Sequence, residues 1–95
     1  MSKTFYFNPN SVESPLAQSL SLFPQPAQNQ IFIKWSYEGI GQLKIYNALG
    51  QEMTQNTIFP QEQKVIPIND WQSGIYLLVM EVSGEIIREK VLIRQ

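Results

Sequence analysis

The sequence predicts an all-β fold, an immunoglobulin-like two-sheet antiparallel β-sandwich of six to seven short strands. From Ser19 onward, short apolar runs are separated by Gly, Pro and Asn residues at the spacing typical of sandwich strands. Several of these runs alternate with a period of two residues, and none has a sustained helical period. Apolar residues make up 43% of the chain, which is ordinary for a packed domain. We therefore expect residues 19–95 to form one sandwich domain.

The first two predicted strands precede residue 36. In residues 20–23 leucines alternate with serines until Pro24 and Pro26, which cannot donate to a β-ladder and suit the end or edge of a strand. In residues 31–35 every second side chain is a large apolar one, the pattern of a strand with one strongly buried face. We therefore expect Trp35 to be a core residue.

The middle of the chain is predicted to form three further strands. Residues 43–46 alternate in hydropathy and lead into Asn47–Gly50, which fits a hairpin loop with Gly50 in the left-handed conformation. Residues 51–59 are polar and are expected to form a weak or edge strand. Burial resumes in residues 65–68, where two isoleucines share one face.

The last third of the chain is predicted to form a hairpin. Residues 75–80 are apolar at every position, which indicates a central strand that is either covered on both faces or lies opposite a second sheet. A turn at residues 69–74 precedes this strand, and Ser83-Gly84 reverses the chain tightly after it. The closing strand is expected to bury Ile87, Val91 and Ile93 and to expose Arg88, Lys90 and Arg94.

Composition excludes several classes of function. Seven Lys and Arg against eight Asp and Glu give a net charge of −1, so we expect no nucleic-acid partner. The longest apolar stretch, Ile75 to Met80, is far shorter than the roughly 20 residues of a membrane-spanning helix, so we expect no such segment. Cysteine and histidine are absent, which removes the usual metal ligands and the usual nucleophile and base pairs. A carboxylate pair such as Asp70 and Glu52 is not fixed at a working separation, and Asp70 is expected to form a turn. We expect no enzymatic activity, no cofactor and no metal.

The first eighteen residues differ from the rest of the chain. An aromatic triplet is followed by Asn, Pro and Ser residues without sustained periodicity. We expect residues 1–18 to be a linker or the remnant of a preceding region.

Four segments in order resemble the type IX secretion C-terminal sorting domain family. They are Phe23-Pro-Gln-Pro26, Leu43-Lys-Ile-Tyr-Asn-Ala-Leu-Gly50, Gly74-Ile-Tyr-Leu-Leu78 and Lys90-Val-Leu-Ile-Arg94. The family pattern is a Tyr-Pro-Asn-Pro-like opening, an aliphatic-Tyr-Asn-x-x-Gly turn, a Gly-[Ile/Val]-Tyr strand and a basic-aliphatic closing strand. The resemblance covers residues 20–95 and places the motif at Pro24, Pro26, Tyr46, Asn47, Gly50, Gly74 and Tyr76.

Three positions depart from that pattern. Phe23 stands where Tyr is usual, Gln25 where Asn is usual, and Gln95 where a basic residue is common. An Asn at position 25 could cap a local turn, which the longer Gln side chain closes less well.

The resemblance implies a C-terminal sorting signal of an exported protein from a Bacteroidetes-type bacterium. Its implied partners are an outer-membrane secretion translocon, a sortase-like surface peptidase that removes the domain, and an N-terminal cargo domain on the same chain. The implied route passes through the periplasm to the cell surface or the medium.

The last strand is the predicted recognition element for the export machinery. It comprises Lys90, Val91, Leu92, Ile93 and Arg94. Strand addition at an exposed edge would supply backbone hydrogen bonds, and Lys90 and Arg94 would meet an acidic surface. In the alternative interpretation these charges only keep an edge strand soluble.

A second hypothesis is a non-catalytic carbohydrate-binding or adhesive module of a secreted protein. Such sandwiches use exposed aromatic rings to stack on sugars. Because Trp35 is expected in the core and Trp71 at the end of the sandwich, Tyr37 and Tyr46 remain as possible stacking residues.

Overall fold

Two antiparallel sheets make up the domain, which confirms the predicted fold class. The computed structural model describes residues 19–95, and the predicted linker 1–18 lies outside the described residues. No helix occurs within this range. The strands are β1 (Leu20–Phe23), β2 (Gln30–Trp35), β3 (Gly41–Tyr46), β4 (Glu52–Ile58), β5 (Gln63–Pro67), β6 (Gly74–Val82) and β7 (Glu85–Ile93).

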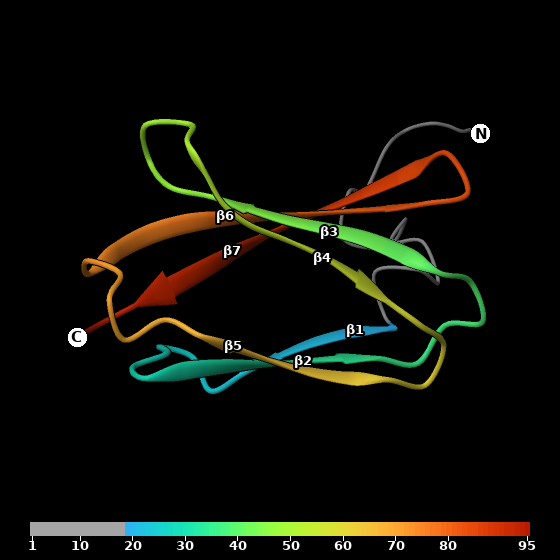
Figure 1. Cartoon of the computed structure of the whole chain (residues 1–95), viewed down its shortest axis with the longest axis horizontal. Helices are drawn as coiled ribbons and strands as arrows, with labels where there is room; N and C mark the ends of the chain where they lie inside the picture. Colours follow the sequence, from blue (N-terminus) through green and yellow to red (C-terminus); the bar gives the residue numbers. More distant parts are fainter. Residues whose placement is uncertain (1–18) are drawn as a thin grey trace, which may run out of the picture.

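The strands are arranged in two layers (Figure 1). One sheet has the order β1-β2-β5, and the other has the order β4-β3-β6-β7. All neighbouring strands pair antiparallel. As predicted, β4 is an edge strand, and β6 and β7 form a hairpin with Tyr76 opposite Val91.

The core lies between the two sheets and is formed mainly by alternate residues of the strands, together with Ala27 and Ile68 from the connections. Trp35 is fully buried, as predicted, and its indole Nε1 donates a 2.8 Å hydrogen bond to the carbonyl oxygen of Gly39. No polar or charged residue within residues 19–95 is buried. The core side chains are Ala27, Ile31, Ile33, Trp35, Leu43, Ile45, Ile58, Ile66, Ile68, Tyr76, Leu78, Met80, Val82, Ile87, Val91 and Ile93.

Two tight turns confirm the glycine positions that the sequence predicts. The Asn47–Gly50 turn closes with a hydrogen bond from the Gly50 amide to the Asn47 carbonyl oxygen, and Gly50 has a φ of 84°. At the β6–β7 reversal, Ser83 and Gly84 both have positive φ, 51° and 83°, as a type I′ hairpin turn requires.

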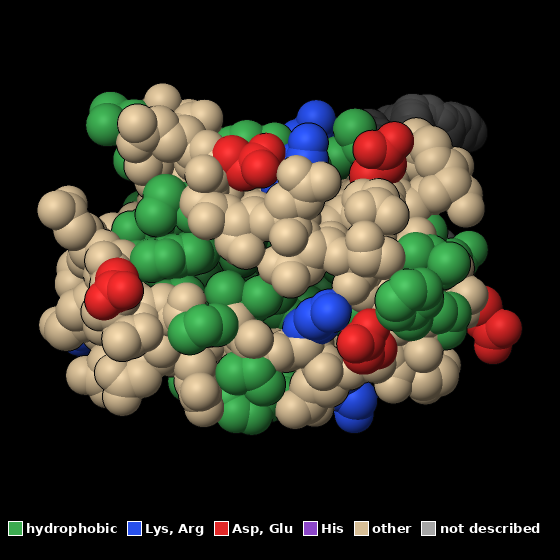
Figure 2. All heavy atoms as spheres, in the orientation of Figure 1, with side chains coloured by type: hydrophobic (Ala, Val, Ile, Leu, Met, Phe, Trp, Pro, Cys, Tyr) green, Lys and Arg blue, Asp and Glu red, His purple; other side chains and the backbone are tan. Residues whose placement is uncertain are grey.

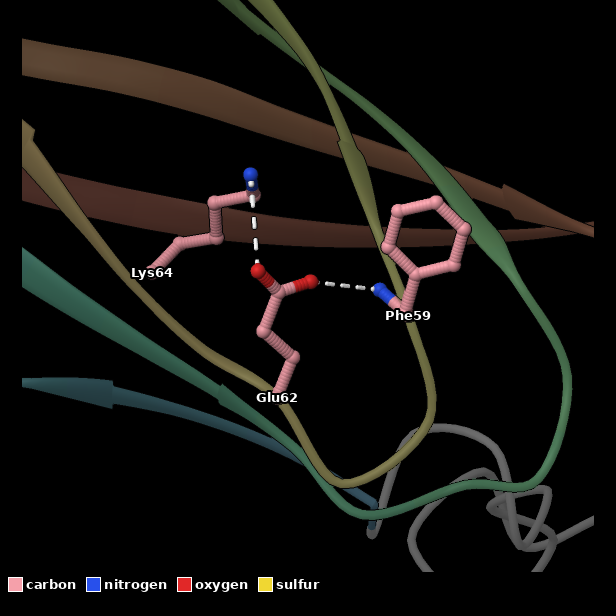
Figure 3. Close-up of polar contacts among 3 residues, drawn as sticks. All are labelled: Phe59, Glu62 and Lys64. Carbon is pink, nitrogen blue, oxygen red and sulfur yellow. Dashed lines mark hydrogen bonds and ion pairs between the residues drawn. The ribbon is translucent and has the colours of Figure 1, made fainter.

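The β4–β5 turn carries the chain from one sheet to the other and is held by one carboxylate (Figure 3). Glu62 Oε1 accepts a 2.7 Å hydrogen bond from the Phe59 amide, and Glu62 Oε2 lies 3.6 Å from Lys64 Nζ. The Phe59 carbonyl oxygen in turn accepts a hydrogen bond from the Glu62 amide. These two reciprocal hydrogen bonds between Phe59 and Glu62 close the turn before β5.

Strand β6 departs from one of the two expectations for it. Its inward residues are buried, but Ile75 and Leu77 on the opposite face are 56% and 38% exposed. A strand opposite a second sheet is therefore correct, and a strand covered on both faces is wrong. The reason is that residues 19–95 form only two layers, so no further element within them covers the outer face.

Between the layers, Figure 2 shows hydrophobic side chains on the viewed side of the molecule.

Candidate recognition surface

The predicted recognition strand alternates between the core and the surface. Val91 and Ile93 are buried, whereas Lys90, Leu92 and Arg94 are exposed. Among the seven described strands, β7 pairs with β6 alone and forms one edge of the four-stranded sheet. Alternation along an edge strand thus anchors one set of side chains and presents the other set outward, as the sequence predicts.

On the side of β7 that faces away from β6, backbone groups near the C-terminal end of the strand already make hydrogen bonds. The Ala27 amide donates to the Leu92 carbonyl oxygen, and the Arg94 amide donates to the Ala27 carbonyl oxygen, both at 2.8 Å. The Gln25 side chain continues this contact: its Oε1 accepts from the Leu92 amide at 3.1 Å, and its Nε2 donates to the Lys90 carbonyl oxygen at 3.4 Å. Incoming strands therefore meet an occupied backbone here, while the outward side chains stay exposed.

Gln25 thus has a role that the sequence analysis missed. Its longer side chain does not close a local turn but reaches across to β7. Pro24 and Pro26 flank it, both preceded by cis peptide bonds, and Ala27 behind it is fully buried. No local signal could have identified this contact, because its partners lie 65 and 67 residues away in the sequence.

Asn47 organises the turn after β3. Its Oδ1 accepts hydrogen bonds from the Leu49 and Gln51 amides, each at 2.9 Å, and its Nδ2 donates to Gln51 Oε1 at 2.8 Å. Asn is favoured at such positions because its short side chain mimics a backbone turn. The motif position at Asn47 is therefore structural, while its neighbour Tyr46 lies half-buried on the outer face of the sheet.

Tyr76 and Gln95 fix the turn that precedes β6. The Tyr76 hydroxyl donates a 2.7 Å hydrogen bond to the Gln72 carbonyl oxygen, and its ring stacks on Trp71 with centroids 5.1 Å apart. Gln95 Nε2 donates to the carbonyl oxygens of Ile68 and Trp71 at 2.6 and 2.8 Å. Both bonds need a donor, which explains how Gln can stand where the family commonly has a basic residue.

The turn after β3 and the turn before β6 enclose a cleft of about 430 Å³. Its lining includes Met53, the exposed Leu49, Trp71 and Tyr76. Asp70 is the charged residue of the lining. The motif glycine Gly74 also borders this cleft, at the start of β6.

The two tyrosines considered for sugar stacking are not brought together. The Tyr37 ring packs against Trp35 at a centroid distance of 5.6 Å and lies near Val82, since both would contact a Cβ built on Gly39. Tyr46 lies opposite Leu77 of β6. Val82, near Tyr37, and Leu77, opposite Tyr46, are five residues apart along β6, about 17 Å at the usual rise of a strand. Sugar binding through either ring stays a prediction.

Acidic side chains among residues 19–95 do not gather into a metal site. No group of three or more potential ligands occurs there. Glu52 pairs with Lys44 at 3.9 Å across the sheet, and Asp70 lies in its predicted turn. The same part of the chain contains no helix suited to crossing a membrane.

The chain thus forms a small β-sandwich domain, and its edge strand β7 presents Lys90, Leu92 and Arg94 at the surface. A family model described as a secretion system C-terminal sorting domain matches residues 21–94. The chain therefore belongs to this family, that of the type IX secretion C-terminal sorting domains, as its motifs indicate. The family is one of sorting signals and not of catalysts, which fits the expected lack of enzymatic activity. A search of curated proteins gave no match.

Proposed function

We propose that this domain directs a larger protein on the same chain through the type IX secretion system and across the outer membrane, and that it is cut off afterwards. The observation that carries the proposal is the family match over residues 21–94, which includes β2 to β7 and all of β1 except Leu20. The partners are the outer-membrane translocon, a sortase-like surface peptidase and the N-terminal cargo. The cargo passes through the periplasm and ends at the cell surface or in the medium.

Recognition by side chains is better supported than strand addition at the end of β7. Gln25 and Ala27 bind the Lys90 carbonyl, both backbone groups of Leu92 and the Arg94 amide. The side chains of the same three residues are exposed. A receptor can therefore contact them without displacing any bond within the domain.

A reporter fusion tests the proposal. A monomeric fluorescent protein carrying a periplasmic leader is joined ahead of residues 1–95 and expressed in a bacterium that has type IX secretion. We expect the reporter at the cell surface or in the medium, and its retention in an isogenic strain without the translocon. The reporter without residues 1–95 is the control. Retention of the intact fusion in the secreting strain refutes the proposal.

Cleavage has its own readout in the same strains. If the domain is removed after export, the extracellular reporter is smaller than the retained reporter by up to about 11.0 kDa, the mass of all 95 residues. Mass spectrometry of the exported reporter then locates the cut. An exported reporter of unchanged mass contradicts cleavage but leaves sorting intact.

A further inference from the structure

The outer face of the four-stranded sheet presents an apolar row along its central strand β6. The row consists of Ile75, Leu77 and Val79, which alternate with the core residues of that strand. Leu92 of β7 lies opposite Ile75, and Tyr46 of β3 lies opposite Leu77. With neighbouring strands about 4.8 Å apart, these side chains form one continuous patch.

This patch is exposed in residues 19–95. Ile75 and Leu92 are 56% and 42% exposed, although they pair across the sheet. Single exposed apolar residues are common on protein surfaces, but a contiguous group across three strands marks an interaction site more often. Their exposure leaves apolar area that a partner can remove from water.

Positive charge flanks the apolar row on both sides. Lys44 and Arg88 lie on either side of Val79, and Lys90 lies opposite Leu77. With Arg94, the outer face carries four cations against the two carboxylates of Glu52 and Glu81, a net charge of +2.

The rest of the described domain has the opposite sign. Outside that face, residues 19–95 carry two cations, Lys34 and Lys64, against five carboxylates, a net charge of −3. A domain with this asymmetry is oriented by an acidic partner surface before contact is made.

From the patch and the charge asymmetry together we infer that the whole outer face of β3, β6 and β7 docks onto a protein surface with an apolar centre and an acidic rim. The inference rests on the proposed sorting function and deepens it, because it extends the recognition site from one strand to three. The apolar row supplies buried area, and Lys44, Arg88 and Lys90 set the orientation of the complex. Face-to-face pairing of two copies would bring two positive faces together and is disfavoured.

Matched variants of the reporter fusion test the inference. The face is altered by Ile75→Thr with Leu77→Thr, and separately by Arg88→Gln with Lys90→Gln. The controls are Val65→Thr, a 48% exposed position on the other sheet, and Lys34→Gln with Lys64→Gln, which changes the net charge equally. Threonine keeps the β-propensity of these exposed positions. Thermal denaturation of each purified chain reports whether the variant folds.

We expect each face variant to lower export by about fivefold or more, the loss typical of truncating a central interface residue, while both controls export normally. Normal export of the face variants overturns the inference and leaves the sorting function standing. Retention of the unaltered fusion overturns the sorting function and the inference with it. Equal losses in face and control variants also overturn the inference.

Two measurements on the purified chain separate other occupants of the face. Flotation with vesicles containing anionic phospholipid, with neutral vesicles as the reference, tests a lipid surface. Sedimentation equilibrium tests self-association. Binding to anionic vesicles that Arg88→Gln with Lys90→Gln abolishes, or a dimer that Leu77→Thr dissociates, assigns the face to that occupant and overturns the inference.

Discussion

Substitutions of Gln95 test whether the end of the described chain is held by donated hydrogen bonds. Gln95→Ala removes the two bonds from Nε2 to the carbonyl oxygens of Ile68 and Trp71. At a net value of roughly 0.5–1.5 kcal/mol each, and with Gln95 largely exposed, we expect a loss of about 1–2 kcal/mol in the free energy of unfolding. For a domain of this size the corresponding fall in Tm is about 5–15 °C.

The chemistry of the replacement gives the sharper result. Gln95→Lys retains donors and is expected to keep most of the stability. Gln95→Glu presents only acceptors to two carbonyl oxygens and is expected to be at least as unstable as Gln95→Ala. Thermal unfolding followed by circular dichroism measures all three. A Glu variant as stable as the original chain, or a Lys variant as unstable as Ala, refutes this account of the turn.

Substitutions at four further positions probe other parts of the fold. Asn47→Ala removes the acceptor of two amide hydrogen bonds and is expected to lower the free energy of unfolding in chemical denaturation by about 1–2 kcal/mol. Asn47→Asp keeps that acceptor and is expected to lose less. Equal losses in the two variants contradict the role of Asn47 as an acceptor in the turn. Gly41→Ala is expected to cost about 1–3 kcal/mol, because its Cβ would collide with the buried Met80 sulfur; an unchanged Tm contradicts the packing. Gln25→Ala is expected to cost about 1 kcal/mol and to speed hydrogen exchange of the Leu92 amide; unchanged exchange contradicts the contact. Leu78→Ala should lose about 2–5 kcal/mol, and a loss below about 1 kcal/mol would place Leu78 outside the core.

Strand positions and their inward faces were predictable because alternation is a local signal. Every second residue of the segment around Ile31 and Ile33 is buried, and the same holds for Val91 and Ile93. The turns at Gly50 and Ser83-Gly84 were predictable for a similar reason, since positive φ favours few residue types. Local stereochemistry therefore accounts for most of the fold.

Contacts between distant segments could not be predicted in the same way. The bridge between Ala27 and β7 and the hydrogen bonds of Gln95 depend on how two sheets pack, which no single segment encodes. The apolar pattern of residues 75–80 was ambiguous, because an exposed docking row and a doubly buried strand have the same composition. Only the placement of Ile75 and Leu77 outside the core distinguishes the two.

Export of a fusion whose domain cannot fold tests most directly whether the folded surface is the signal. Leu78→Asp puts a charge into the core of β6 and leaves the sequence from Lys90 to Gln95 unchanged. Circular dichroism first establishes that the purified variant is unfolded, and export is then measured at matched levels of intact fusion. We predict that this fusion stays inside the cell while the unaltered fusion is exported. Equal export of the two would contradict the account, because the linear C-terminal segment would then suffice.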